Sequence, residues 1–167
     1  MNVRIRVALA LACSAFVMPL LGGCSLTAPA ARTGEISHAD VLAIKEAVLK
    51  DLFDFQKPKL HPWRPGISAY VIDDPADGSE LARDFTGHHP PVTAGPAIVN
   101  DADENLDAAT GKPVEVYAVR IRQISCDHAT VGAGWRSATL VGIWYTYDLQ
   151  RVKGVWMVKK RAVVGVS

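Results

Sequence analysis

The chain has 167 residues, 49% of them hydrophobic and 21% charged, and its 18 Lys and Arg nearly balance its 17 Asp and Glu. A formal net charge of +1 excludes the broad basic surface on which sequence-independent nucleic-acid binding depends. The length is sufficient for one domain with a core of its own.

The N-terminus has the pattern of a secretion signal. Arg4 and Arg6 precede an almost purely apolar run over residues 7–21. This run of about 15 residues is shorter than the roughly 20 that span a bilayer as a helix. A basic start followed by an apolar segment of this length predicts a signal peptide that is removed.

The run closes on Leu-Gly-Gly-Cys at residues 21–24, which resembles the lipobox of bacterial lipoproteins. The resemblance implies that residues 1–23 are cleaved and that Cys24 carries the acyl chains, which anchor the protein to the membrane. An ordinary secretory signal that precedes a cysteine is the alternative. Residue 25 is Ser, whereas Asp at that place resembles the inner-membrane retention signal of enteric-type bacteria. The expected location is therefore the cell envelope, at the periplasmic face of the outer membrane.

Cleavage would change the charge and the cysteine count. Loss of Arg4 and Arg6 leaves 16 bases against 17 acids, a formal charge of −1. Of the three cysteines, Cys13 would leave with the signal and Cys24 would be acylated. No intramolecular disulfide is then possible for Cys126, and a small buried hydrophobe is the expectation for it, with a reactive or intermolecular thiol as the alternative.

Residues 24–36 predict a flexible tether that reaches at most about 40 Å, and residues 37–167 a single domain. Ser37 and Asp40 form a capping-box-like pair at the start of a helix. Apolar residues at helical spacing from Val41 to Phe55 indicate about 18 residues that end before Pro58. Lys45, Glu46 and Lys50 are expected on the polar side.

The next segment, residues 58–113, is interrupted by six further prolines. It predicts a short strand at 67–72 and a short helix at 78–85.

The last third predicts four strands, at residues 114–124, 129–135, 138–149 and 155–166. The first and third show alternation of apolar and other residues, and the short connections require antiparallel neighbours. Helices followed by an antiparallel meander predict an α+β fold.

The motif Tyr-x-Leu-x-Arg-x-x-Gly-x-Trp-x-Val over residues 147–158 resembles the closing hairpin of the nuclear transport factor two-like (cystatin-like) superfamily. The resemblance implies an amphipathic N-terminal helix packed on a curved antiparallel sheet of about four strands that forms a cone. The proline-rich middle departs from that pattern. Some members of the superfamily are isomerases or dehydratases, but no catalytic motif is matched here, and no catalytic residue is assigned.

Metal and cofactor sites are not predicted. The acidic run at 101–107 has oxygen ligands at the odd positions of a calcium loop, but Leu106 and Lys112 occupy the places of its Gly and bidentate Glu. A solvated loop is the expectation. The pair His88-His89 and the pair Cys126 and His128 do not have zinc-ligand spacing, and surface turns are expected for both.

Charge and aromatic residues give the binding hypothesis. Residues 73–113 contain nine acids against two bases, and residues from 114 onward contain eight bases against three acids. This pattern has two alternative explanations. The opposite charges pair within the molecule, or a basic face of the sheet binds an anionic partner. Aromatic residues crowd the same strands, which predicts a filled core or a pocket lined by them. The residues chosen as the binding face are Arg120, Arg122, Trp144 and Trp156.

Three functions follow as hypotheses. The first is a membrane-anchored, non-enzymatic binding module for another envelope protein or a small ligand. An immunity or inhibitor protein would be a module of this kind. The second is a cone-pocket enzyme of the isomerase or dehydratase kind with a small apolar substrate. The third is a structural envelope component. The sequence does not predict the oligomeric state.

Overall fold

The computed structural model describes residues 36–55, 66–99, 104–138 and 141–166. The predicted signal peptide, Cys24 and all of the tether except residue 36 lie outside these ranges. Within them, neither helix is both long and apolar enough to cross a membrane.

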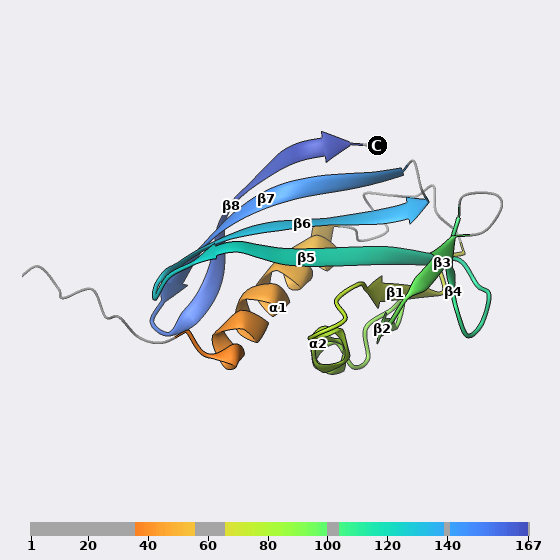
Figure 1. The fold of residues 1–167 in the computed structure, drawn as a ribbon, viewed down its shortest axis with the longest axis horizontal. Helices are drawn as coiled ribbons and strands as arrows, with labels where there is room; N and C mark the ends of the chain where they lie inside the picture. Colours follow the sequence, from red (N-terminus) through yellow and green to blue (C-terminus); the bar gives the residue numbers. More distant parts are fainter. Residues whose placement is uncertain (1–35, 56–65, 100–103, 139–140, 167) are drawn as a thin grey trace, which may run out of the picture. The chain divides into compact units, whose positions relative to one another are not determined.

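The described residues form two helices and eight strands (Figure 1). The elements are α1 His38–Phe55, β1 Ala69–Ile72, α2 Gly78–Asp84, β2 Val92–Ala94, β3 Ala97–Val99, β4 Asn105–Asp107, β5 Val114–Ile124, β6 His128–Ala138, β7 Val141–Val152 and β8 Val155–Val166. Six strands form one sheet in the order β2-β1-β5-β6-β7-β8, and β3 and β4 form a separate two-stranded ribbon.

Helix α1 begins as the sequence predicts. The backbone N–H of Asp40 donates to Ser37 Oγ at 3.1 Å, and the N–H of Ser37 donates to Asp40 Oδ2 at 3.3 Å. This reciprocal capping box satisfies two N–H groups that have no partner within the helix. The predicted length of about 18 residues is confirmed, since α1 contains 18.

The four long strands are confirmed as an antiparallel meander. β5 pairs with β6, β6 with β7 and β7 with β8. The β7–β8 connection consists of Lys153 and Gly154, both with positive φ, at 51° and 86°. Positive φ at both central residues is the type I′ geometry whose twist matches that of the flanking strands.

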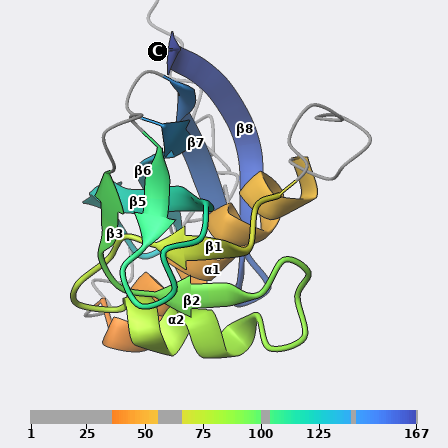
Figure 2. The ribbon, with the colours of Figure 1, turned by 90° about the vertical axis from the view of Figure 1, so that its right-hand side faces the viewer.

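The fold class expected from the sequence is wrong. The main sheet has six strands rather than about four, and it is mixed, because β1 runs parallel to both β2 and β5. A second helix, α2, makes the crossover that a parallel β1–β2 pair requires (Figure 2). The curved antiparallel sheet of a nuclear transport factor two-like cone therefore does not describe this molecule.

The predicted strand at 67–72 and helix at 78–85 correspond to β1 and α2, whereas β2 and the parallel pairing of β1 were not predicted. All four residues of β1 are buried, so the strand has no alternation of apolar and polar positions. Only three residues of β2 pair with β1, and prolines flank β2 on both sides.

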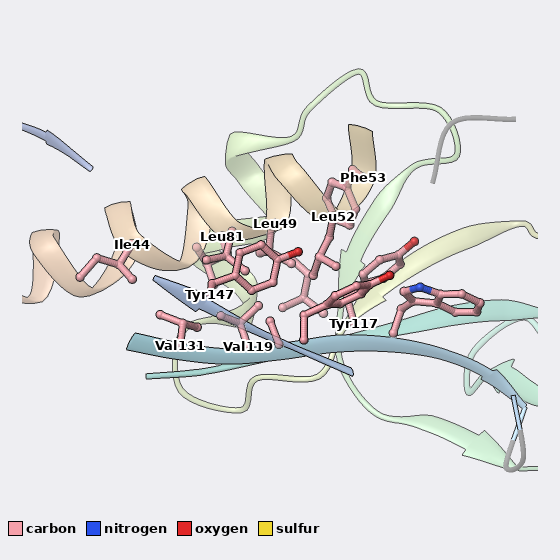
Figure 3. Close-up of a cluster of buried hydrophobic side chains, with 14 of the residues drawn as sticks. Ile44, Leu49, Leu52, Phe53, Leu81, Tyr117, Val119, Val131 and Tyr147 are labelled. Carbon is pink, nitrogen blue, oxygen red and sulfur yellow. The ribbon is translucent and has the colours of Figure 1, made fainter. Parts of the chain in front are cut away.

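The core fills the space between α1 and one face of the sheet, which we call the inner face. Side chains from α1 and from the strands point toward one another there (Figure 3). Completely buried members include Ile44, Leu52, Tyr117, Val131 and Tyr147.

The opposite face, which we call the outer face, is covered at one end. A smaller cluster of Ala69, Val71, Val114 and Val116 lies there, with Ala97 of β3 packed against it. Asn105 of β4 donates to the carbonyl of Arg136 in β6 at 3.2 Å. The β3–β4 ribbon thus shields the β1–β5 end of the outer face.

Candidate binding surface

The predicted aromatic pocket is not found between α1 and the inner face. Trp135, Tyr145 and Tyr147 are buried to 2% exposure or less within the same cluster as the helix side chains. The interior is therefore occupied by packed side chains, which leaves the surface as the place for a site.

One surface pocket, of about 600 Å³, opens where β1 ceases to pair with β5. The last paired residue of β5 in that ladder is Tyr117. Beyond it, residues 119–121 line the pocket with Val41 and Lys45 of α1 and residues 73–75. Its lining combines apolar side chains with four charged residues, Lys45, Asp73, Asp74 and Arg120.

Lys45 is the unexpected residue at this pocket. Its side chain is 11% exposed, and its Nζ donates to Asp74 Oδ2 at 2.5 Å and to Asp77 Oδ2 at 2.6 Å. The expectation that Lys45 lies on the polar side of the helix is wrong. A signal was present, because Lys45 stands four residues after Val41 and four before Leu49, which puts all three on one helical stripe.

The pKa values show how tightly these charges are paired. Burial would lower the pKa of Lys45, but its hydrogen bonds to Asp74 and Asp77 outweigh burial and raise it. Burial would raise the pKa of Asp74, but the bond from Lys45 and the backbone N–H of Asp77 lower it. The three groups satisfy one another and join α1 to the β1–α2 connection, so a structural role explains them.

The uncovered part of the outer face has an unusual floor. We call this uncovered part of the face the outer patch. It consists of Arg122 and of two rows of paired residues across four strands, Arg120-Gly132-Thr146-Ala162 and Ala118-Gly134-Trp144-Gly165. A Cβ built on Gly134 would lie 2.6 Å from Cε3 of Trp144, and one built on Gly132 would lie 2.8 Å from Nε of Arg122. The indole and the guanidinium therefore lie over bare backbone.

Three of the four predicted face residues come together in this patch. Arg120 and Arg122 are exposed on β5, and Trp144 on β7 is 39% exposed. Trp156 does not join them. It is only 5% exposed, on the inner face, and its Nε1–H donates to Asp40 of α1 at 3.4 Å.

Sequence reasoning missed the two glycines that form the floor. Gly132 and Gly134 stand two residues apart in β6, and they alternate with Val131, Ala133 and Trp135. This alternation of glycine with larger residues is a signal for a strand whose second face accepts close approach by other groups.

Acids of helix α1 pair with bases of the sheet. Arg151 lies 3.1 Å from Asp40, and Arg161 donates to Asp51 at 2.7 Å. These two acids lie outside residues 73–113, so the pairs do not account for the opposite-charge pattern. Arg120 and Arg122 are exposed on β5, where Arg120 also lines the pocket beside α1.

The residues with potential zinc-ligand side chains, His88 and the pair Cys126 and His128, lie in places with local structural contacts. His88 lies against Phe53 and Tyr70, with Nδ1 2.7 Å from the carbonyl oxygen of Pro90. This half-buried place differs from the surface turn expected for it. His128 pairs with Asp127 at 2.9 Å, and Cys126 in the same turn is half-buried.

Part of the acidic run at 101–107 lies outside the described residues. Within the described part, Asp107 accepts the N–H groups of Ala109 and Thr110. No group of three or more potential ligands that could hold a metal ion occurs among the residues that the structure describes.

The charges of Lys45 and Asp74 at the pocket are paired with each other, while the outer patch combines exposure, basic charge and an aromatic ring. No protein-family model, curated protein or solved structure matches this chain.

Proposed function

We propose that this protein is a membrane-anchored envelope lipoprotein that binds another protein, and that the outer patch is its binding surface. One observation carries the proposal: the aromatic residues Trp135, Tyr145 and Tyr147 are buried, whereas Trp144, Arg120 and Arg122 are exposed together over the glycines of β6. Tryptophan and arginine are the residue types most enriched in the energetically dominant contacts of protein interfaces.

The geometry favours a protein partner over a small substrate. A small-molecule site needs a concave pocket that buries most of its ligand, and the patch is a sheet face. Trp144 presents a ring that rests on Gly134, so little side-chain entropy remains to be lost on binding.

The expected partner surface is acidic, because Arg120 and Arg122 lie on the same strand face two residues apart. Complementary charge accelerates encounter and selects the correct partner, and its effect weakens with salt. An inhibitor that covers another protein in the periplasm belongs to this class.

The test is co-purification from crosslinked envelopes of cells that produce the full chain. Wild type should retain a stoichiometric partner, while Trp144→Ala and the pair Arg120→Glu with Arg122→Glu should reduce its recovery at least tenfold. The matched control is the pair Arg83→Glu with Lys112→Glu, which makes the same change of net charge at exposed sites away from the patch. Loss of the partner in the control as well, or no stoichiometric partner under crosslinking, would contradict the proposal.

A further inference from the structure

Strand β8 is an edge strand with unusual exposure of apolar side chains. It pairs with β7 and is last in the strand order (Figure 2). Among the described residues, six large hydrophobic side chains are exposed, and five of them are on β8: Val155, Met157, Val163, Val164 and Val166. The sixth, Trp144, stands opposite Gly165 of β8. An exposed apolar edge is a template for a further strand.

Charge divides this edge into two parts. Lys159, Lys160 and Arg161 occupy the middle of the strand, whereas residues 162–166 are Ala-Val-Val-Gly-Val. Lysine on an edge strand discourages pairing with another chain. The uncharged segment 162–166 has no such protection.

Helix α1 supports β8 only partway along its length. Side-chain bonds from the helix reach Trp156 and Arg161. Past Arg161, the inward side chains Val163 and Val166 are 59% and 72% exposed. The end of the strand is therefore accessible from the inner face as well as from the edge.

We propose that residues 163–166 of β8 pair antiparallel with the same segment of a second copy of this chain. The register follows from the faces of the side chains. Val163 is paired with Tyr145 and Val166 with Ile143, so both point to the inner face, and Val164 between them is the extra residue of a β-bulge. A two-fold axis between positions 164 and 165 places Val163 of each copy opposite Val166 of the other.

The basic run 159–161 favours this register over registers that bring two such runs together, and the lack of charge in the pairing segment favours a second copy of the chain as the partner. In the proposed register, the two Arg161 side chains stand about 23 Å apart at 3.3 Å per residue, which exceeds the Debye length of about 8 Å at physiological salt. Registers centred on Lys160 would set the basic runs opposite each other. The pairing segment itself contains no charge that calls for an acidic partner, and its apolar residues complement themselves, as an isologous contact requires.

The contact is short. A pairing over four residues falls below the roughly 1,000 Å² of a durable interface, so the dimer is weak in dilute solution and must be trapped. Cysteine crosslinking of the full chain, in a background in which Cys13, Cys24 and Cys126 are all replaced by Ser, achieves this. Across the proposed axis, the Cα atoms of residue 164 lie about 6 Å apart, within disulfide reach.

Val164→Cys should form a disulfide-linked dimer of twice the chain's mass on mild oxidation. Val155→Cys is the matched control, because Val155 and Val164 are on the same strand and are 63% and 58% exposed. Residue 155 lies about 60 Å from its symmetry mate in the proposed register. We expect at least tenfold more dimer from Val164→Cys than from Val155→Cys.

A second variant separates pairing from random collision. Val163→Lys would put like charges about 10 Å apart across the axis, and it should abolish the Val164→Cys dimer. Met157→Lys, at an exposed site outside the segment, should leave it intact. Equal dimer from Val155→Cys and Val164→Cys, no dimer from Val164→Cys, or a crosslinked product of another mass would each overturn the proposal. Circular dichroism spectra confirm that each variant is folded.

Discussion

The ammonium group of Lys45 lies 2.6 Å from Oδ2 of Asp77, although the two residues are 32 positions apart in the sequence. Asp74 holds the same Nζ at 2.5 Å. The helix before the sheet and the connection after β1 are thereby joined through one buried cation and two carboxylates. This connection gives the first two predictions.

Replacing Lys45 by Met should destabilise the fold. Removal of one member of a buried ion pair leaves uncompensated charge, which costs about 3 kcal/mol, and here two largely buried carboxylates would lose their partner. Urea unfolding at pH 7 should show this decrease in the free energy of unfolding. The control is Lys50→Met on the same helix, because Lys50 and Glu46 form an exposed i,i+4 pair that is worth about 0.5 kcal/mol or less. Equal losses in both variants would contradict a special role for Lys45.

The same cluster predicts the sign of the pH dependence. The folded-state pKa of Asp74 is below its ordinary value of 3.8, since the Lys45 and backbone hydrogen bonds outweigh burial. The stabilisation that follows is complete above pH 3.8 and is lost as the pH falls through the folded-state pKa. The urea midpoint of wild type should therefore decrease below about pH 4.

Lys45→Met should flatten this slope. Without the cation, the pKa of Asp74 should rise, because only the backbone N–H groups of Ala76 and Asp77 remain to oppose burial. The urea midpoint of the variant should therefore decrease less than that of wild type below about pH 4. Parallel pH profiles for wild type and variant would show that Lys45 does not control these carboxylates.

The glycines of the outer patch should differ in their tolerance of alanine. A Cβ on Gly134 would meet the carbonyl oxygen of Ile143 at 2.4 Å as well as the Trp144 ring, so backbone must shift. A Cβ on Gly132 would meet only the end of the flexible Arg122 side chain, at 2.8 Å and beyond. We expect Gly134→Ala to cost about 2 kcal/mol, in the range of overpacked sites, and Gly132→Ala to be nearly neutral.

Thermal unfolding measures both glycine variants. If the outer patch binds a partner, Gly132→Ala should still weaken binding, because Arg122 is displaced while the fold is retained. A Gly134→Ala protein as stable as wild type would mean that the ring and the strand separate more easily than the geometry indicates.

The elements that the sequence predicts well are those with a local cause. The capping pair Ser37 and Asp40 marks the start of α1, and the alternation at the end of β5, from Val119 to Arg122, reflects one covered face. The parallel strand β1 is buried on both faces, so its pattern contains no period. Its partners, β2 and β5, are set by the α2 crossover and by tertiary packing, which no short stretch of sequence encodes.

The site was predictable only in part for the same reason. Arg120 and Arg122 share a face by strand period, and Trp144 was chosen because it is aromatic. Trp156 is also aromatic, but it is paired with Arg151 across the β7–β8 hairpin, and its side chain lies on the inner face, where it contacts Asp40. Which face of β8 meets α1 depends on the bulge at Lys159 and on the path of the helix, and neither is visible in residue types.

The predicted anchor at Cys24 is tested by its removal. Each buried methylene of an acyl chain contributes roughly 0.8 kcal/mol, so two or more chains hold a protein firmly at a membrane. Cys24→Ala should therefore move the folded domain into the soluble periplasmic fraction, or leave an uncleaved precursor at the inner membrane, as fractionation and immunoblotting would show.

Cys126→Ala is the matched control for this experiment. Cys126 lies in the β5–β6 turn of the folded domain, so its replacement removes a thiol without touching residues 21–24. Membrane association should persist in Cys126→Ala and be lost in Cys24→Ala. An unchanged outer-membrane location for Cys24→Ala would refute the lipid anchor. In that case the outer patch would not be tied to the membrane, and partners would have to be sought throughout the compartment where the chain is found.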